Sequence, residues 1–218
     1  MLPNELRVEA FVNGPFMENT YLLTAAGRAL LVDPGFSSDQ EYDRFLDVYR
    51  QSGAELLAVV LTHAHIDHVL GLHRVLDSFD VPVYLNHADL YLWQHFSEQS
   101  ALFGFRTRPF DFTPEPLEEG DSPGGLAPFT FQVLHTPGHA PDHTSLYFED
   151  QGFLISGDVL FASSIGRTDL YKGNADLLEA SIRTKLYVLP EETRVLPGHG
   201  EETTIGREMR ENSFVRAV

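Results

Sequence analysis

The chain has 218 residues, a length that suits one large domain with a buried core and is short for two. Its formal net charge is −17, from 32 acidic and 15 basic residues, so we expect neither nucleic acid nor an anionic membrane as a partner. There are no cysteines, which excludes disulfides, thiolate nucleophiles and thiolate metal ligands. Without a long apolar run or a secretory leader pattern, the sequence predicts a cytoplasmic protein.

Strand and helix patterns alternate through the first part of the chain. Residues 21–25 and 29–33 are apolar runs on either side of a glycine turn, which predicts a β-hairpin. Residues 38–51 carry aromatic and leucine side chains at helical spacing after a serine cap, which predicts a helix. The continuous apolar run 56–61 predicts a buried strand, and apolar positions between 69 and 79 predict a second helix.

The middle of the chain is less regular. Residues 81–85 have a strand pattern and residues 88–99 a helical one. Seven aromatic residues fall between 91 and 112, which suits either a surface excursion with its own small core or a flap over a binding site; we favour the first. Residues 114–128 form a turn-rich connection.

The last third returns to the alternating pattern. The predicted elements are strands at 129–134, 145–148, 153–156 and 194–196, and a helix at 174–188 that Asn174 caps. Mixed strands and helices along the whole chain predict an α/β fold, which we expect to form a single domain over residues 1–218.

Side chains that bind metals follow directly after four of these predicted strands. They are five imidazoles and two carboxylates: His63, His65, Asp67, His68, His139, Asp158 and His199. Sheets collect functional loops along the edge where parallel strands end, so distant segments can converge on one site. Seven ligands exceed what one ion with an open position needs, and they suit two ions that share a carboxylate and a hydroxide. Imidazole with carboxylate favours zinc, with iron or manganese as alternatives.

The remaining histidines need no metal to explain them. His73, His87 and His95 stand alone in the sequence and are expected to be solvated or hydrogen-bonded. His135 and His143 flank the ligand set, and we expect structural roles for both.

In combination, these motifs resemble the metallo-β-lactamase superfamily over nearly the whole chain, from residue 19 to residue 200. The matching segments in chain order are Leu31-Val32-Asp33-Pro34-Gly35, the H-x-H-x-D-H pattern at 63–68, His139, Asp158 and His199. The resemblance implies a four-layer αβ/βα sandwich with a two-metal site at one edge.

The resemblance also implies a role for each residue. The first ion would be held by His63, His65 and His139, the second by Asp67, His68 and His199, and Asp158 would bridge them. Asp33 would orient a ligand histidine, and Asp67 would help to hold or accept a proton during catalysis.

Residues 163–173, with the sequence SSIGRTDLYKG, are similar to short bacterial hydrolases of the glyoxalase II type, which cleave hydroxyacyl-glutathione thioesters. This similarity implies that a hydroxide bridging two metal ions attacks a small, glutathione-linked thioester. Arg167 and Lys172 on the same segment are candidates to bind the anionic substrate, with ordinary surface charge as the alternative.

Two other functions stay open at this stage. Persulfide dioxygenases, which use one iron ion, share the Gly-Arg-Thr-Asp motif, and a non-catalytic metal-binding member of the fold is the second alternative. Many β-lactamases of the family carry a cysteine where Asp158 stands, and glyoxalase II proper has a C-terminal helical region for glutathione. Here only 18 residues follow Gly200, which leaves the acyl group and the thiol of the substrate open. The oligomeric state is also open.

Overall fold

The computed structural model describes residues 5–120 and 123–216, which form two compact units. The first unit takes its described residues from the chain up to Leu85, from Leu90–Pro116 and from Pro123–Thr130. The second takes them from Asn86–Asp89, from 117–120 and from Phe131 onward. Each unit contains one mixed β-sheet with helices, as the α/β prediction requires. The single-domain organisation stays a prediction.

The sheet of the first unit has the strand order β1-β2-β3-β4-β5-β6. Its strands are β1 (Arg7–Asn13), β2 (Glu18–Ala25), β3 (Arg28–Val32), β4 (Glu55–Val60), β5 (Val83–Leu85) and β6 (Glu115–Pro116). The pairs β1–β2 and β2–β3 are antiparallel, and the pairs from β3 to β6 are parallel. The predicted hairpin is confirmed as β2–β3. The edge strand β1 was not predicted because most of its residues are not buried, which weakens the apolar alternation.

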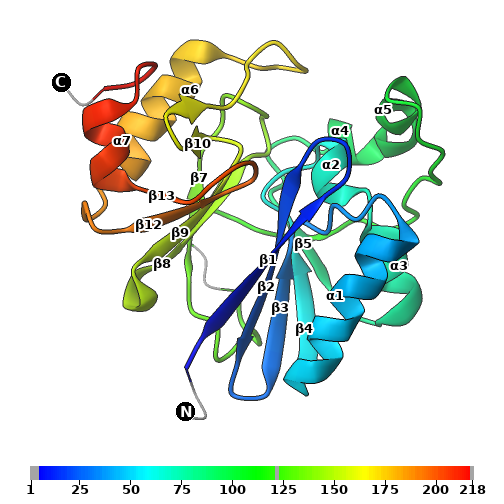
Figure 1. Ribbon diagram of the computed structural model, residues 1–218. Helices are drawn as coiled ribbons and strands as arrows, with labels where there is room; N and C mark the ends of the chain where they lie inside the picture. The colour runs from blue at the N-terminus through cyan, green and yellow to red at the C-terminus, as the bar shows by residue number, and fades with distance from the viewer. Residues whose placement is uncertain (1–4, 121–122, 217–218) are drawn as a thin grey trace. The chain divides into compact units, whose positions relative to one another are not determined.

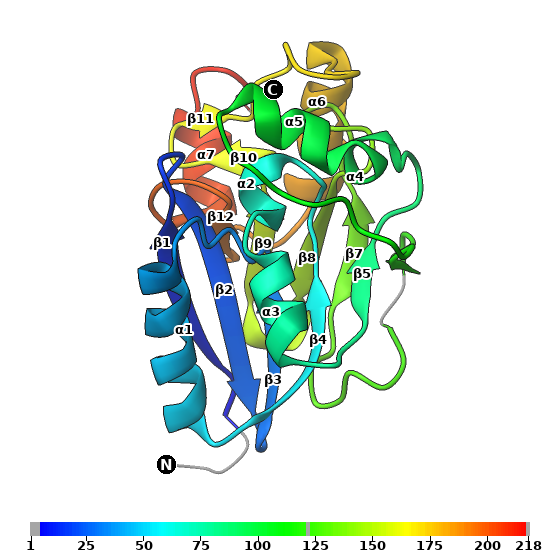
Figure 2. The same ribbon diagram turned by 90° about the vertical axis from the view of Figure 1, so that its right-hand side faces the viewer.

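Helices α1 (Asp39–Ser52) and α3 (Leu72–Ser78) cover one face of this sheet (Figure 2). Helix α1 was predicted correctly, since Ser38 and Glu41 form a reciprocal capping box and Gly53 ends the helix at φ 63°. The second predicted helix is wrong in its start, because α2 (Ile66–Val69) and α3 are separate. A side chain at Gly71 would collide with Phe36, and the Gly71 N–H donates to Pro34 O at 2.8 Å, which fixes the break.

The aromatic residues between 91 and 112 pack largely against each other. The rings of Trp93 and His73 each stack on Phe110 with centroids 4.2 Å apart, and Phe96 lies 5.0 Å from the same ring. The predicted helix in this region is two short ones, α4 (Tyr91–Gln94) and α5 (Phe96–Leu102). The segment therefore has a small core of its own.

The sheet of the second unit has the strand order β13-β12-β9-β8-β7. Its strands are β7 (Gln132–His135), β8 (Thr144–Phe148), β9 (Phe153–Gly157), β12 (Arg194–Pro197) and β13 (Thr203–Thr204), and a short hairpin, β10 (Leu160–Phe161) and β11 (Ser164–Ile165), follows β9. A 3-10 turn, η1 (Glu149–Gln151), joins β8 to β9. The predicted strand 129–134 begins later, at Gln132.

Two helices pack on this second sheet (Figure 1). Helix α6 (Ala175–Ser181) continues as a π-helical turn, η2 (Ile182–Leu186), and Asn174 caps it as predicted. The C-terminal helix α7 (Ile205–Glu211) was not predicted. Leu178 of α6 and Ile205 of α7 belong to one buried apolar cluster with Leu154 and Val195 of the sheet, so burial of the apolar helix faces holds both in place.

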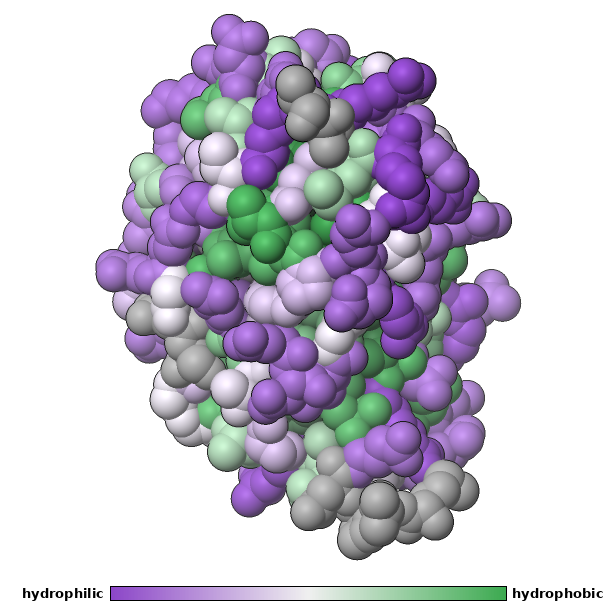
Figure 3. Space-filling model, turned by 90° about the vertical axis from the view of Figure 1, so that its left-hand side faces the viewer, coloured by the Kyte–Doolittle hydropathy of each residue, from purple (hydrophilic) through white to green (hydrophobic). Residues whose placement is uncertain are grey.

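The molecular face in Figure 3 is largely hydrophilic, with smaller apolar areas between the polar side chains. Among the helices within residues 5–120 and 123–216, none combines the length and the hydrophobicity that crossing a bilayer requires.

Candidate metal centre

In the first unit, the end of strand β4 delivers four ligand-type residues together. The chain leaves the strand at Val60 and turns into helix α2, with His63 and His65 on the turn and Asp67 and His68 in the helix. All three histidines are buried and Asp67 is half-buried. The rings of His65 and His68 lie 4.8 and 4.1 Å from that of His63, and ligand atoms of Asp67 and His68 lie within 4.8 Å of each other. Their spacing suits metal ions.

The carboxylate of Asp33, the residue directly after strand β3, supports this group. It accepts hydrogen bonds from the Thr62 backbone N–H and hydroxyl, both at 2.7 Å, and lies 2.9 Å from Nδ1 of His68. Nδ1 of His63 lies 3.0 Å from the Thr62 hydroxyl. Because Nδ1 is engaged in both rings, the Nε2 edge is the one presented for a metal. Asp33 itself has φ 50°, an uncommon conformation that aspartate tolerates.

Sequence reasoning missed a second buried carboxyl beside this group, that of Glu18 at the start of β2. Burial raises the pKa of Glu18 well above its ordinary value, and nearby His68 opposes that rise. The Thr20 hydroxyl lies 3.0 Å from one of its oxygens. A side chain at Gly35 would collide with Glu18 and with the Asp67 carbonyl, which explains the glycine of the Asp-Pro-Gly motif. An isolated glutamate at a strand start carries no signal that could have identified it.

In the second unit, three ligand-type residues come from three separate segments. Asp158 follows β9 and His199 follows β12, and these strands are parallel neighbours joined beyond their ends by the Gly198 N–H to Gly157 O bond at 2.8 Å. Nε2 of His199 lies 3.3 Å from Asp158 Oδ2, and Nε2 of His139 lies 3.5 Å from the same oxygen. A carboxylate that faces two imidazoles in this way suits a bridging ligand.

The loop that carries His139 is held by close backbone packing. Gly138 has φ 134°, and any side chain there would collide with the backbone of Leu178 in α6. Its carbonyl accepts the Asn174 N–H at 2.8 Å. Nδ1 of His139 lies 2.8 Å from the Arg167 carbonyl, to which it donates, so Nε2 is the atom presented toward Asp158. A backbone carbonyl in this role leaves no trace in the sequence.

His143 has the structural role predicted for it, and that role serves Asp158. The Asp158 N–H donates to Nε2 of His143 at 2.9 Å, so the proton of this neutral ring is on Nδ1, 2.9 Å from the Thr136 hydroxyl. His135, the other flanking histidine, contacts the Pro141 carbonyl at 3.0 Å through Nε2.

The two candidate substrate-binding cations are both engaged in ion pairs. Arg167 makes a two-point contact with Asp169, at 2.7 and 2.8 Å, which lowers the pKa of Asp169 to about 2. Lys172 lies 2.6 Å from Asp89, and this hydrogen bond raises the pKa of Lys172. All four side chains belong to the second unit, and Arg167 and Lys172 are exposed.

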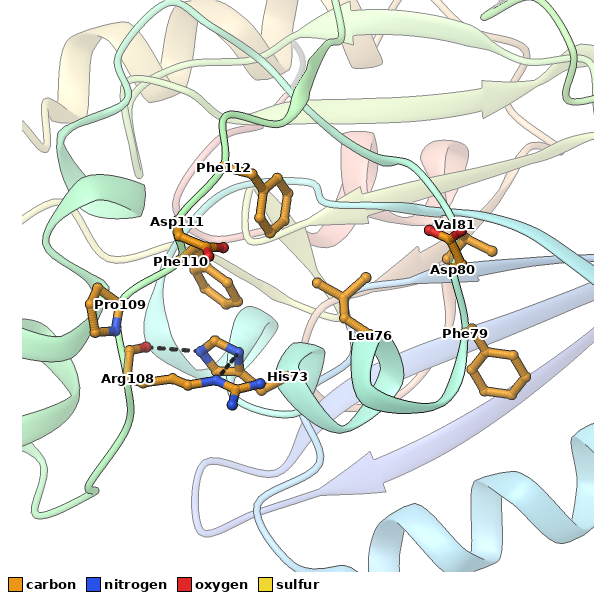
Figure 4. A pocket seen from close by; sticks show the side chains of 10 residues that line it. All are labelled: His73, Leu76, Phe79, Asp80, Val81, Arg108, Pro109, Phe110, Asp111 and Phe112. Atoms are coloured by element: carbon orange, nitrogen blue, oxygen red, sulfur yellow. Dashed lines mark hydrogen bonds between the residues drawn. The ribbon is translucent and has the colours of Figure 1, made fainter.

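A separate pocket of about 650 Å³ lies in the first unit against α3 (Figure 4). None of the seven candidate ligands lines it. Its His73 is fixed through Nε2 to the Arg108 carbonyl at 2.8 Å, and Arg108 is paired with Asp77. These groups already satisfy one another, so the isolated His73 is structural, as expected.

The donor set fits divalent metals such as zinc, iron or manganese. All seven side chains offer nitrogen or oxygen, and most are buried. In His63, His68 and His139 the hydrogen-bond partner engages Nδ1 and leaves Nε2 as the ligand atom.

The chain is similar to known proteins over residues of both units. The model of the family described as the metallo-beta-lactamase superfamily matches residues 13–199. The probable metallo-hydrolase YqgX of Bacillus subtilis (strain 168) is 40% identical over 93% of this chain and 94% of its own. The hydroxyacylglutathione hydrolase GloC of Haemophilus influenzae (strain ATCC 51907 / DSM 11121 / KW20 / Rd) is 35% identical over 87% of this chain and 88% of its own.

Two solved structures are similar along their whole length. The structure of TTHA1623 in a di-iron-bound form has a TM-score of 0.85 and 39% identity, covering 95% of this chain and 100% of that one. The BLEG-1 B3 metallo-beta-lactamase has a TM-score of 0.83 and 37% identity, covering 96% of this chain and 99% of that one. These matches confirm the fold class predicted from the motifs.

Proposed function

Because the chain belongs to the metallo-β-lactamase superfamily, we propose that its two ligand groups form one dinuclear centre that hydrolyses a small, glutathione-type thioester. The coarser assignment, a metal-dependent hydrolase, follows from the family match, the metallo-hydrolase relatives and the buried His/Asp groups. The thioester is supported by the similarity to a hydroxyacylglutathione hydrolase over 87% of the chain.

The observation that carries the proposal is Asp158, whose Oδ2 faces the Nε2 atoms of both His139 and His199. In the proposed centre Asp158 would bridge the two ions. His63, His65 and His139 would complete one ion's ligands, and Asp67, His68 and His199 would complete the other's. We expect zinc, with iron as the main competitor because a similar structure is a di-iron form.

When bound, the ions supply Lewis acidity that yields hydroxide from water near neutral pH and polarises the thioester carbonyl. The residues of the chain orient the ligands: Asp33 aligns His68, the Arg167 carbonyl aligns His139, and His143 holds the backbone of Asp158. Asp67, half-buried, also holds or accepts a proton. A thiolate is a good leaving group, so the reaction needs no strong general acid.

The substrate would be anionic, and we propose Arg167 and Lys172 as its cationic contacts. Their pairs with Asp169 and Asp89 mean that a substrate carboxylate competes with a carboxylate already in place. We therefore expect a modest contribution to affinity from each, because exposed ion pairs stabilise weakly.

The proposal is tested by steady-state kinetics of metal-loaded protein on S-lactoylglutathione and on a β-lactam, together with metal analysis. We expect two ions per chain and a kcat/KM at least about a hundredfold higher for the thioester. The β-lactam is the necessary competitor, because a similar structure is a B3 metallo-beta-lactamase. No thioesterase activity with zinc, iron or manganese would reject the proposal. One iron per chain with oxygen consumption on glutathione persulfide would favour the dioxygenase.

The same assay tests the cationic contacts. Arg167→Ala should raise KM about two- to fivefold with little change in kcat, because it removes a contact made equally to substrate and transition state. Asp169→Asn should lower KM, because it weakens the ion pair that now engages the Arg167 guanidinium group. Arg74→Ala, which breaks an exposed pair with Asp39 in the first unit, is the matched control. If KM is unchanged in both Arg167→Ala and Asp169→Asn, then Arg167 is an ordinary surface charge and does not bind the substrate.

A further inference from the structure

The C-terminal helix α7 carries a wholly buried carboxylate, that of Glu208. Three neutral groups donate to it: the Ser163 backbone N–H at 2.9 Å, the Thr203 hydroxyl at 2.5 Å and the Asn212 side-chain amide at 2.9 Å. Burying a carboxylate is costly unless such bonds satisfy it, so this position has a demanding geometry. Helix α7 lies beyond residue 199, where the family match ends.

These bonds connect α7 to the hairpin β10–β11. Ser163, at the turn of that hairpin, has φ 60°, a left-handed conformation that costs a serine free energy and needs support from its surroundings. Glu208 supports it by accepting the Ser163 N–H. The amide of Asn212, the residue that ends α7, also donates to the Ser164 carbonyl at 3.0 Å, so two adjacent residues of the hairpin are bound to α7 and its C-cap.

The hairpin in turn determines the position of the Arg167 carbonyl. Two residues after Ser164, the Gly166 N–H donates to Val159 O at 3.2 Å. Gly166 lies so close to the Asp158 carbonyl that a side chain there would collide with it. The next residue is Arg167, whose carbonyl accepts the Nδ1–H of His139 at 2.8 Å. A continuous series of contacts therefore runs from Glu208 to His139 within the second unit.

We propose that Glu208 is a positioning residue for the metal centre, acting through the β10–β11 hairpin on the Arg167 carbonyl and thereby on His139. The proposal rests on the assignment of His139 as a ligand in the proposed function. Carbonyls that orient ligand histidines raise their basicity and fix their direction. A shift of the hairpin would lengthen the hydrogen bond from His139 to the Arg167 carbonyl. It would thereby lower the affinity for the ion that His139 holds.

The test is a zinc titration of metal-free protein against a chromophoric chelator, which needs no catalytic activity. In Glu208→Gln the amide nitrogen replaces one acceptor, so either the Ser163 and Asn212 donors lose their partner or the Thr203 hydroxyl must turn from donor to acceptor. We expect about a tenfold weaker affinity for one ion, and an unchanged affinity for the other. A tenfold loss is the lower end of the range for residues that support metal ligands. In the zinc-loaded variant, the Nδ1 proton of His139 should exchange with solvent faster by NMR. Thr203→Val, a milder change, should act in the same direction.

Two controls on the same helix separate positioning from general loss of stability. Glu211→Gln removes an exposed pair with Arg207 and should leave the zinc affinity unchanged. Ile205→Val trims the buried core of α7 and should lower the melting temperature without changing zinc affinity. Wild-type zinc affinity in Glu208→Gln and Thr203→Val would overturn the proposal. So would an equal loss in Ile205→Val. If thioesterase activity is absent but the titrations behave as expected, the proposed reaction fails and this inference stands.

Discussion

The two ligand groups are built in different ways. In the first unit, four ligand-type residues lie within six consecutive positions at the start of helix α2, and a buried side chain, Asp33, orients His68. In the second unit, three ligand-type residues come from three segments, and the supports act through the backbone: the Arg167 carbonyl orients His139, and the His143 side chain holds the N–H of Asp158. The first group depends on a local motif, whereas the second depends on the packing of strands and loops.

This difference has a consequence for mutation. In the first unit, the supporting residues are themselves side chains and can be removed directly. In the second, the Arg167 carbonyl is a backbone atom, and its support can be altered only through the groups that hold that backbone, such as Gly166 or the contacts of α7. We expect metal binding by the second group to be sensitive to a wider set of positions.

The largest expected effect comes from the carboxylate of the second group. Asp158→Ala should abolish binding of at least one ion, because it removes the oxygen that faces both His139 and His199. His143→Ala removes the acceptor of the Asp158 N–H rather than a candidate ligand, and it should weaken metal binding about ten- to a hundredfold. Zinc titrations of both variants decide this, and equal retention of metal would remove Asp158 from the bridging position.

In the first group, Asp33→Asn sharpens the comparison, because asparagine tolerates φ 50° and the change isolates the hydrogen bonds. The amide nitrogen of the asparagine would then face either the Thr62 N–H, or the Thr62 hydroxyl and Nδ1 of His68. In the wild type these groups bond to the Asp33 carboxylate. We expect the free energy of unfolding to fall by about 2–3 kcal/mol and zinc affinity by about ten- to a hundredfold. Urea denaturation measures the first. The exposed Asp39→Asn is the control, and an equal effect there would contradict the role of Asp33.

The last prediction concerns the pH dependence of Glu18, a buried carboxyl beside the first group. Burial raises its pKa above the ordinary 4.5, so the folded metal-free protein binds a proton that the unfolded chain releases. Its stabilising contribution is complete below about pH 4.5 and is lost as the pH rises toward the folded pKa.

Glu18→Gln, which cannot ionise, should therefore become more stable than the wild type as the pH rises. The difference should grow by up to about 1.4 kcal/mol per pH unit in that window and then level off. Urea denaturation of both metal-free proteins between about pH 5 and pH 8 measures it. A difference that does not change with pH would show that Glu18 is ionised in the folded state.

By itself, the sequence identified the ligand-type residues as candidates and predicted most of the elements that carry them. The cluster from His63 to His68 was predictable because covalent spacing keeps its members close whatever the rest of the chain does. The later Pro-Gly-His and Gly-Asp motifs were recognisable because each follows an apolar run that forms a strand. The helix after Asn174 was predictable for a similar local reason, since one side chain caps its first turn.

Only the tertiary structure decided which groups support those ligands. Glu18 and Glu208 are ordinary glutamates in the sequence, and nothing local distinguishes them from the exposed acids that give the chain its charge. The Arg167 carbonyl is a backbone atom that every residue possesses, so its bond to His139 depends on the path of a loop 28 residues away. Arg167 and Lys172 were chosen for their charge, but charge does not reveal that Asp169 and Asp89 already occupy them. Hydrogen bonds between distant segments depend on packing, and packing is a property of the folded chain.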